Sequence, residues 1–268
     1  MRRLFLFVFI LCFSQLTFAQ RHELGVFAGG ANVIGDIGKA NYINPFPTRI
    51  EKGGSLYFPI SIGGLYRFNI NPQMGFRANI SYSKVGSGDH TSKEYYKLER
   101  NKSFKNNIVE GSVMFEYNFF NINDDQETAQ SPYIFFGVGA FSAKGKEYDY
   151  DEANNVIIEK TKYNTDLSIP FGVGYKVRFN YSWILSFETG IRYTNVDYID
   201  YNTGKFTDRF IEAKKIEFDN YKNDPTLSQP LKEFYDKKNY GNLTNKDWYV
   251  LTGISLTYSF GRPACYCD

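Results

Sequence analysis

The chain has 268 residues, a length that fits one large domain or two small ones. Its 22 Tyr, 25 Phe and 2 Trp contrast with only 2 His and 3 Cys, which argues against a His-rich metal centre. The hydrophobic content of 43% argues against disorder, and the lack of an apolar run of about 18 residues argues against a helical membrane protein. We therefore expect a folded, aromatic, β-rich chain without a metal or other cofactor.

Residues 1–19 have the pattern of a secretory signal peptide. Arg2 and Arg3 precede the apolar run 4–13, and residues 17–19 (Thr-Phe-Ala) supply a cleavage site. The apolar run is too short to span a membrane, so we expect it to be removed. Without Arg2 and Arg3 the chain has 29 Lys+Arg against 29 Asp+Glu, and this neutral balance argues against a nucleic-acid partner.

The remaining chain contains repeated alternation of apolar and polar residues, the pattern of strands with one apolar face. In one such segment Phe76, Ile80 and Tyr82 alternate with Arg77 and Asn79. The eight predicted strands are residues 22–28, 58–68, 76–83, 109–119, 133–143, 167–179, 183–193 and 248–260. Most are about ten to thirteen residues long, close to the length that a tilted strand needs to cross a bilayer.

The connections between these strands alternate in length. The long ones are residues 29–57, 85–106, 144–166 and 195–247, and the short ones are residues 69–73, 120–131 and 180–182. Outer-membrane barrels have short periplasmic turns and longer external loops. We therefore predict an all-β, eight-stranded antiparallel transmembrane β-barrel over residues 20–260 in the cell outer membrane, with both termini in the periplasm.

Aromatic residues gather near the ends of the predicted strands, as in the girdles of membrane barrels. They are Phe58, Tyr66, Phe68, Phe76, Tyr82, Tyr117, Phe119, Tyr175, Phe179, Trp183, Tyr193, Trp248, Tyr258 and Phe260. The alternative is a soluble lipocalin-like barrel, whose apolar face would point inward. That arrangement would put rows of rings inside and the charged face outside, so the membrane barrel is favoured.

The charged residues on the polar faces are predicted to point into the lumen. They are Arg77, Glu110, Glu116, Lys176, Arg178, Glu188 and Arg192. Eight strands enclose a lumen just wide enough for side chains, so we expect a charge network that fills it with ion pairs. An ion pathway is the alternative interpretation of the same residues.

The long connection 195–247 shows helical spacing at residues 211–218 and 227–235, which predicts two short helices. Its charges are mixed, so it fits a solvated cap or a protein-contact surface, and equally a packed exterior loop with no partner. Another loop places His90 near Ser87 and Asp89, but no Gly-x-Ser-x-Gly elbow accompanies them. We therefore predict no enzyme, no catalytic residues and no small-molecule substrate.

Residues 261–268 follow the last predicted strand and contain Cys265 and Cys267. In an oxidising compartment these thiols could pair with each other or with another protein. Without a nearby His they make a weak metal site. The tail is therefore a candidate disulfide or partner contact on the periplasmic side.

Several short motifs carry a resemblance to a known family. They are His22-Glu23-Leu24-Gly25-Val26-Phe27-Ala28-Gly29-Gly30-Ala31-Asn32, Ile34-Gly35-Asp36, Tyr66-Arg67-Phe68-Asn69-Ile70-Asn71-Pro72 and the terminal Cys265-Tyr266-Cys267. Together they resemble PorG-type outer-membrane β-barrels of the type IX secretion system. The resemblance implies an accessory barrel that associates with a periplasmic ring lipoprotein of the secretion machine, in bacteria where that machine often supports gliding. It assigns no catalytic residues. A generic structural or adhesive small outer-membrane barrel is the first alternative, and a lipid-modifying outer-membrane enzyme is the second.

Overall fold

The computed structural model describes residues 21–39, 46–50, 54–94, 97–98, 103–122, 127–150, 156–200 and 246–260. The predicted signal peptide, the tail with Cys265 and Cys267, and both helices predicted within residues 195–247 lie outside these ranges. In the described part of the chain, no helix has the length and hydropathy needed to cross a bilayer.

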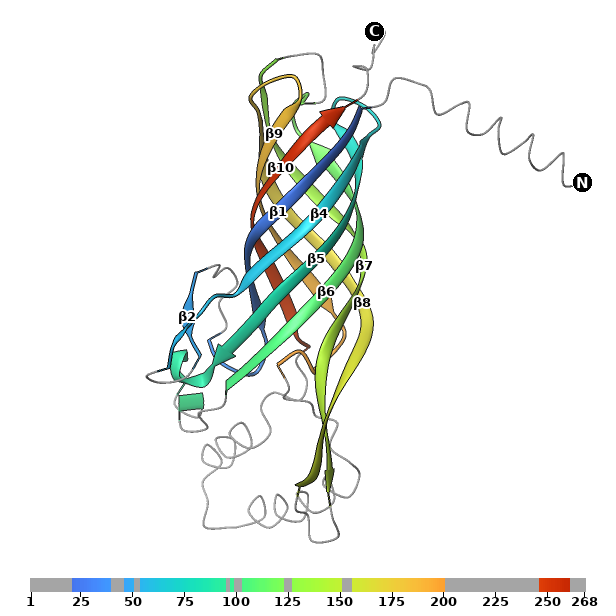
Figure 1. Cartoon of the computed structure of the whole chain (residues 1–268). Coiled ribbons are helices and arrows are strands. Elements are labelled where there is room, and N and C mark those ends of the chain that lie inside the picture. Colours follow the sequence, from blue (N-terminus) through green and yellow to red (C-terminus); the bar gives the residue numbers. More distant parts are fainter. Residues whose placement is uncertain are drawn as a thin grey trace, which may run out of the picture.

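Eight strands close into one antiparallel barrel in the order β1-β10-β9-β8-β7-β6-β5-β4 (Figure 1). They are β1 (Arg21–Ile34), β4 (Ile60–Asn69), β5 (Met74–Gly88), β6 (Ser103–Asn118), β7 (Ala129–Tyr150), β8 (Val156–Arg178), β9 (Trp183–Thr194) and β10 (Trp248–Phe260). Neighbours in the chain are neighbours in the barrel, and β1 pairs with β10 to close it. All eight predicted strands, and the predicted fold class, are confirmed.

The barrel has apolar side chains on its outer face and charged side chains inside, the reverse of a soluble protein. On β6 the outward side chains Val109 and Val113 are 47% and 54% exposed, whereas the inward Glu110 and Glu116 are at most 2% exposed. The apolar face of β6 runs from Val109 to Phe119, about 33 Å along the strand and about 25 Å high at the usual strand tilt. This height matches the apolar band of a transmembrane barrel.

The two ends of the barrel differ. The turn end carries the connections 70–73, 119–128 and 179–182, together with the start of β1 and the end of β10 (Figure 1). Two of these turns are stabilised in the same way by an asparagine side chain. Asn71 Oδ1 accepts hydrogen bonds from the amides of Gln73 and Met74. Asn180 Oδ1 accepts hydrogen bonds from the amides of Ser182 and Trp183. The loop end carries the longer connections.

The loop end contains more regular structure than the sequence predicted. Strands β2 (Thr48–Arg49) and β3 (Leu56–Tyr57) form a small hairpin, and the 3₁₀ helix η2 (Asp89–Thr91) follows β5. The Tyr57 hydroxyl donates a 3.0 Å bond to the Val85 carbonyl, so the hairpin lies against the end of β5.

Strands β7 and β8 continue past the barrel as a two-stranded ribbon, through most of the predicted loop 144–166 (Figure 1). Their pairs extend to Tyr150 and Val156, although β6 pairs with β7 only as far as Ala143 and β9 pairs with β8 only from Ser168. The ribbon is therefore supported on neither side by the barrel sheet.

Candidate functional site

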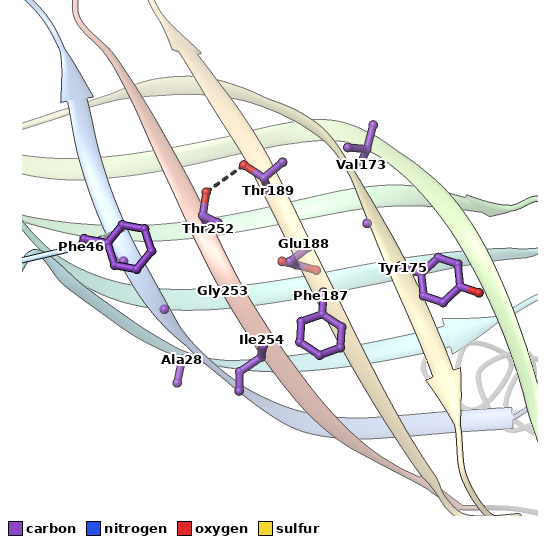
Figure 2. A pocket seen from close by; sticks show the side chains of 13 residues that line it. Ala28, Phe46, Val173, Tyr175, Phe187, Glu188, Thr189, Thr252, Gly253 and Ile254 are labelled. Carbon is purple, nitrogen blue, oxygen red and sulfur yellow. Dashed lines mark hydrogen bonds between the residues drawn. The ribbon is translucent and has the colours of Figure 1, made fainter. Parts of the chain in front are cut away.

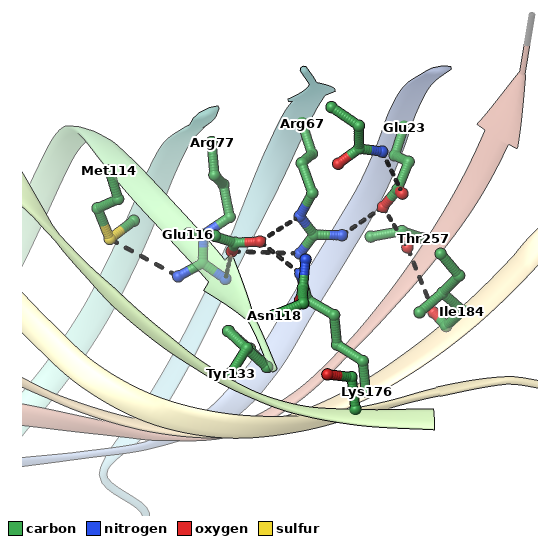
Figure 3. Close-up of polar contacts among 12 residues, drawn as sticks. Glu23, Arg67, Arg77, Met114, Glu116, Asn118, Tyr133, Lys176, Ile184 and Thr257 are labelled. Carbon is green, nitrogen blue, oxygen red and sulfur yellow. Dashed lines mark hydrogen bonds and ion pairs between the residues drawn. The ribbon is translucent and has the colours of Figure 1, made fainter. Parts of the chain in front are cut away.

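The lumen of the turn-end half holds a network of charged and polar side chains, much of which Figure 3 shows, and all eight strands contribute to it. Each member is nearly or completely buried. In strand order they are Glu23, Arg67, Arg77, Glu116, Tyr133, Lys176, Glu188 and, on β10, Thr257. We refer to these eight residues as the lumen network.

Glu116 is the centre of the lumen network. Its carboxylate forms ion pairs with Arg67 Nε at 2.6 Å, Arg77 Nη1 at 3.0 Å and Lys176 Nζ at 2.5 Å. One anion thus faces three cations, which is stable only because two further carboxylates complete the balance.

Glu23 and Glu188 lie at the two sides of this centre. Glu23 is paired with Arg67, and it also accepts bonds from Asn69 Nδ2 at 2.8 Å and Thr257 Oγ1 at 3.3 Å. Glu188 is paired with Arg77 at 2.5 Å and accepts the Tyr133 hydroxyl at 2.5 Å. Three carboxylates therefore balance three cations, and the lumen network is formally neutral.

Aromatic faces cover the cations where carboxylates do not. The Arg77 guanidinium lies 4.8 Å from the centre of the Phe135 ring, and Lys176 Nζ lies 4.3 Å from that of Tyr133. Arg77 also contacts Met114 Sδ at 3.6 Å. The network therefore fills the lumen with side chains on every side.

The other predicted lumen residues lie outside this centre. Glu110 and Arg192 form a separate pair, with Arg192 Nε 3.4 Å from Glu110 Oε2, and the Tyr249 hydroxyl donates to the same carboxylate. Arg178 is buried on the inner face of β8, two residues beyond Lys176. The structure thus brings together Arg77, Glu116, Lys176 and Glu188 and places the remaining three elsewhere in the wall.

The lumen of the loop-end half is largely apolar around the Glu110–Arg192 pair, which the sequence did not predict. Its buried residues form one cluster with Phe27, Phe141 and Leu251 among them. Phe141 and Tyr249 both belong to this cluster, with ring centres 5.6 Å apart, and the Tyr249 hydroxyl joins the cluster to the Glu110–Arg192 pair through its bond to Glu110. The lumen is therefore filled by two layers in series, one ionic and one apolar.

Two aspartates connect the chain segments at the loop end. Asp200 accepts bonds from the amides of Asp36 (2.8 Å) and Ile37 (3.1 Å), and Asp247 accepts the amide of Ile199 at 2.8 Å. The connections after β1 and β9 and the residue before β10 are thereby tied together. We refer to Asp36, Asp200 and Asp247 as the aspartate clasp.

The carboxylates of Asp200 and Asp247 lie close enough to interact. Burial raises the pKa of the Asp247 carboxyl, and the negative charges of Asp200 and Asp197 raise this pKa further. Among the residues that the structure describes, no group of three or more acidic, His or Cys side chains is arranged to hold a metal ion. The clasp is a structural connection in this geometry.

The outer wall has a shallow hollow of about 600 Å³ over β1, β8, β9 and β10 (Figure 2). It forms where the outward residues are small, at Ala28 and Gly30, and larger side chains such as Phe46 and Phe187 border it. Thr189 and Thr252 hydroxyls share a 2.8 Å bond there, so neither needs water.

The sequence matches the family described as "Domain of unknown function (DUF6089)", over residues 2–226 and 215–268. The chain belongs to the DUF6089 family. No curated protein matches the sequence of this DUF6089 member.

Three solved barrels illustrate the structural comparison. Ail of Yersinia pestis, in complex with the heparin analogue sucrose octasulfate, is 10% identical with a TM-score of 0.41, covering 90% of this chain and 99% of Ail. The N-terminal β-barrel domain of Pseudomonas aeruginosa OprF is 10% identical with a TM-score of 0.40, covering 90% and 98%. A major outer membrane protein from Thermus thermophilus is 15% identical with a TM-score of 0.39, covering 90% and 100%.

Proposed function

We propose that this DUF6089 protein is a non-enzymatic outer-membrane barrel that serves the type IX protein secretion machinery, and the gliding that it supports, by associating with the periplasmic ring. The proposal joins the resemblance of the sequence motifs to PorG-type barrels with the geometry of the lumen. It assigns the work of the protein to contacts at the ends of the barrel, with transport through its own lumen excluded.

The observation that carries the proposal is the filled lumen. Every strand gives a side chain to the lumen network, and an apolar layer follows it along the barrel axis. Eight strands leave room for side chains but not for a transported polypeptide. In the proposed role, the barrel is a membrane-embedded fixture for a larger assembly.

The orientation follows from the same comparison of the ends. The start of β1 and the end of β10 both lie at the turn end. The proposal places this end in the periplasm because outer-membrane barrels have their short turns there. The proposal therefore puts the tail with Cys265 and Cys267, which follows β10, on the side of the ring. These cysteines are the proposed ring contact or disulfide.

The polar loop around His90 supports the non-enzymatic assignment. Asp89 Oδ1 accepts the Gly38 amide at 2.8 Å, Thr91 Oγ1 donates to the Gly88 carbonyl at 2.8 Å, and Ser92 Oγ accepts the Glu94 amide at 3.1 Å. These side chains stabilise the backbone of the loop, a role that explains their presence without catalysis.

The proposal is tested by deleting the gene in its host and measuring export of type IX cargo. We expect export to fail and to return with the wild-type gene. The affinity-tagged barrel should also co-purify with a ring lipoprotein, and the variant with Cys265→Ser and Cys267→Ser should lose that lipoprotein if the tail is the contact. Normal export together with no co-purifying lipoprotein would contradict the proposal, and heat-modifiable migration in the membrane fraction separately checks the barrel.

A structural or adhesive outer-membrane barrel is the second candidate, and the β7–β8 ribbon favours it. The ribbon projects from the loop end beyond the support of β6 and β9, where another surface can reach it. Deletion of the ribbon tip, residues 147–159, separates the two functions. Loss of cell attachment with normal cargo export supports the adhesive role, whereas loss of export supports the secretion role.

A further inference from the structure

The outward face of the barrel carries three lysines at one edge of the apolar band. On β5 the lysine is Lys84, which follows the outward Tyr82; on β6 it is Lys105; and on β7 it is Lys144. Among the outward strand residues whose side chains the structure describes, none is acidic. The charge of this face is therefore positive and confined to three adjacent strands.

The register of the strands places the three lysines around one amide side chain. Lys84 lies directly opposite Asn107, and Lys105 is two residues further along β6. Lys144 lies one position beyond the Ile108–Ala143 pair, next to Asn107 on the other side. At the usual strand spacing, the positions of Lys84 and Lys144 are about 10 Å apart. We refer to the three lysines Lys84, Lys105 and Lys144, with Asn107 between them, as the basic triangle.

Two lysines of the basic triangle, Lys105 and Lys144, have defined contacts. The Asn106 side chain accepts a bond from the Lys144 amide at 3.2 Å and donates one to its carbonyl at 2.7 Å, so the backbone of Lys144 is clamped to β6. The Lys144 ammonium lies 5.3 Å from the centre of the Tyr163 ring, and that of Lys105 lies 6.0 Å from the centre of the Tyr57 ring. Ring contact directs an ammonium without using up its hydrogen-bond donors.

The depth of the basic triangle matches that of lipid headgroups. Val109 on β6 and Leu167 on β8 are the last large apolar side chains before it, 47% and 76% exposed. The remaining loop-end edge is different: there Tyr193 of β9 packs on Trp248 of β10 with ring centres 5.1 Å apart. One side of the barrel therefore presents ammonium groups beside the rings of Tyr57 and Tyr163 at the edge of the bilayer, and the other side presents the Tyr193–Trp248 ring pair.

We propose that the basic triangle is a binding site for the phosphate group of an anionic membrane lipid in the leaflet at the loop end. Three ammonium groups and an amide provide donors around one point, with no carboxylate on the same described face to oppose a phosphate. Long lysine stems can lie along the apolar band while their ammonium groups reach the headgroups. The inference rests on the membrane location in the proposed function but not on a secretion role.

The test measures binding of diphosphoryl lipid A to the full-length refolded protein in non-ionic detergent, by native mass spectrometry. The site variant carries Lys84→Gln, Lys105→Gln and Lys144→Gln. The matched control carries three changes at exposed loop lysines, Lys39→Gln, Lys93→Gln and Lys246→Gln. We expect the site variant to lose roughly 10- to 100-fold in affinity, and the control to change by less than about twofold.

Further arms identify the source of the phosphate. Phosphatidylcholine, which has no net charge, should bind wild type more weakly than lipid A, and inorganic phosphate should not displace bound lipid A. Added NaCl should weaken lipid A binding because the lysines are exposed. These three measurements use wild type alone, so they still test the binding of an anionic lipid if the site variant does not fold.

Equal affinities of wild type and the site variant would overturn the proposal, as would an equal loss in the control variant. Affinity that is independent of NaCl, or equal for phosphatidylcholine and lipid A, would also overturn it. Displacement of bound lipid A by inorganic phosphate would show that the site binds the free phosphate ion and not a lipid. A protein absent from the membrane fraction would instead contradict the proposed membrane location.

Discussion

Glu116 is the residue on which the lumen network depends most. Its carboxylate is completely buried and contacts Arg67, Arg77 and Lys176, while Glu23 and Glu188 each pair with one arginine. Removing one partner of a buried ion pair leaves uncompensated charge, which costs more than the pair itself contributes. A substitution that removes the charge of Glu116 with almost no change of shape tests this dependence.

We expect Glu116→Gln to lower the free energy of unfolding by about 3–5 kcal/mol, because three buried cations would then face two carboxylates. The measurement is urea unfolding of the refolded barrel in lipid vesicles. Glu94→Gln is the control: its side chain is 55% exposed and 3.6 Å from Lys97 Nζ, so the change should be within about 0.5 kcal/mol. Similar losses in the two variants would contradict the central role of Glu116.

The sequence identified the inward direction of seven charged residues but not their partners. Alternation alone predicted that Arg77, Glu116, Lys176 and Glu188 face inward. Arg67 belongs to the same network and alternates in the same way between Tyr66 and Phe68, so attention to that segment would have found it. Pairing depends on how the strands are staggered around the barrel, and no single strand contains that information.

At the scale of elements, the strength of the alternation decided what could be predicted. The eight strands have one face in lipid, so each gave a periodic signal. The ribbon formed by β7 and β8 beyond Lys144 leaves the apolar band and carries mixed charges, so its sequence resembled a loop. Strands β2 and β3 have two residues each and are too short for any periodic signal.

The aspartate clasp predicts a pH dependence at the loop end. The pKa of Asp247 is raised in the folded chain, so its contribution to stability is complete below the ordinary Asp pKa and declines as pH rises through the raised value. The charged groups that oppose its ionisation are Asp200 and Asp197. In wild type, therefore, the protection of the Ile199 and Asp200 amides should fall as pH rises.

The measurement is amide hydrogen exchange of Ile199 and Asp200, corrected for the intrinsic effect of pH. Asp247→Asn should remove the dependence, since the amide oxygen can still accept both bonds and carries no charge. Asp166→Asn is the control, because Asp166 binds the nearby Tyr198 hydroxyl and lies outside the clasp. An unchanged slope in Asp247→Asn would show that another group titrates.

At the scale of the whole molecule, the two layers of the lumen act in series. The ionic layer lies in the turn-end half and the apolar layer in the loop-end half, so removing one leaves the other in place. We expect wild type to show no ion conductance in planar bilayers. Arg77→Ala with Glu188→Ala, which keeps the lumen neutral, should remain closed.

Adding Phe27→Ala and Phe141→Ala to that pair should open a conducting path, because both rings belong to the apolar layer. Heat-modifiable migration checks that each variant still forms a barrel. Conductance by the Arg77→Ala, Glu188→Ala variant alone would show that the apolar layer does not seal. A closed four-site variant that still folds would show that further side chains block the lumen.

The seam between β1 and β10 sets the order of events when the protein is made. It joins the first and last strands through pairs from His22–Phe260 to Ile34–Trp248, and Thr257 reaches Glu23 across 234 residues of chain. Contacts between such distant residues form late and slowly. Until β10 pairs with β1, both edge strands have unpaired backbone groups, which lipid cannot satisfy. The interior charges of such an open sheet have only part of their final partners.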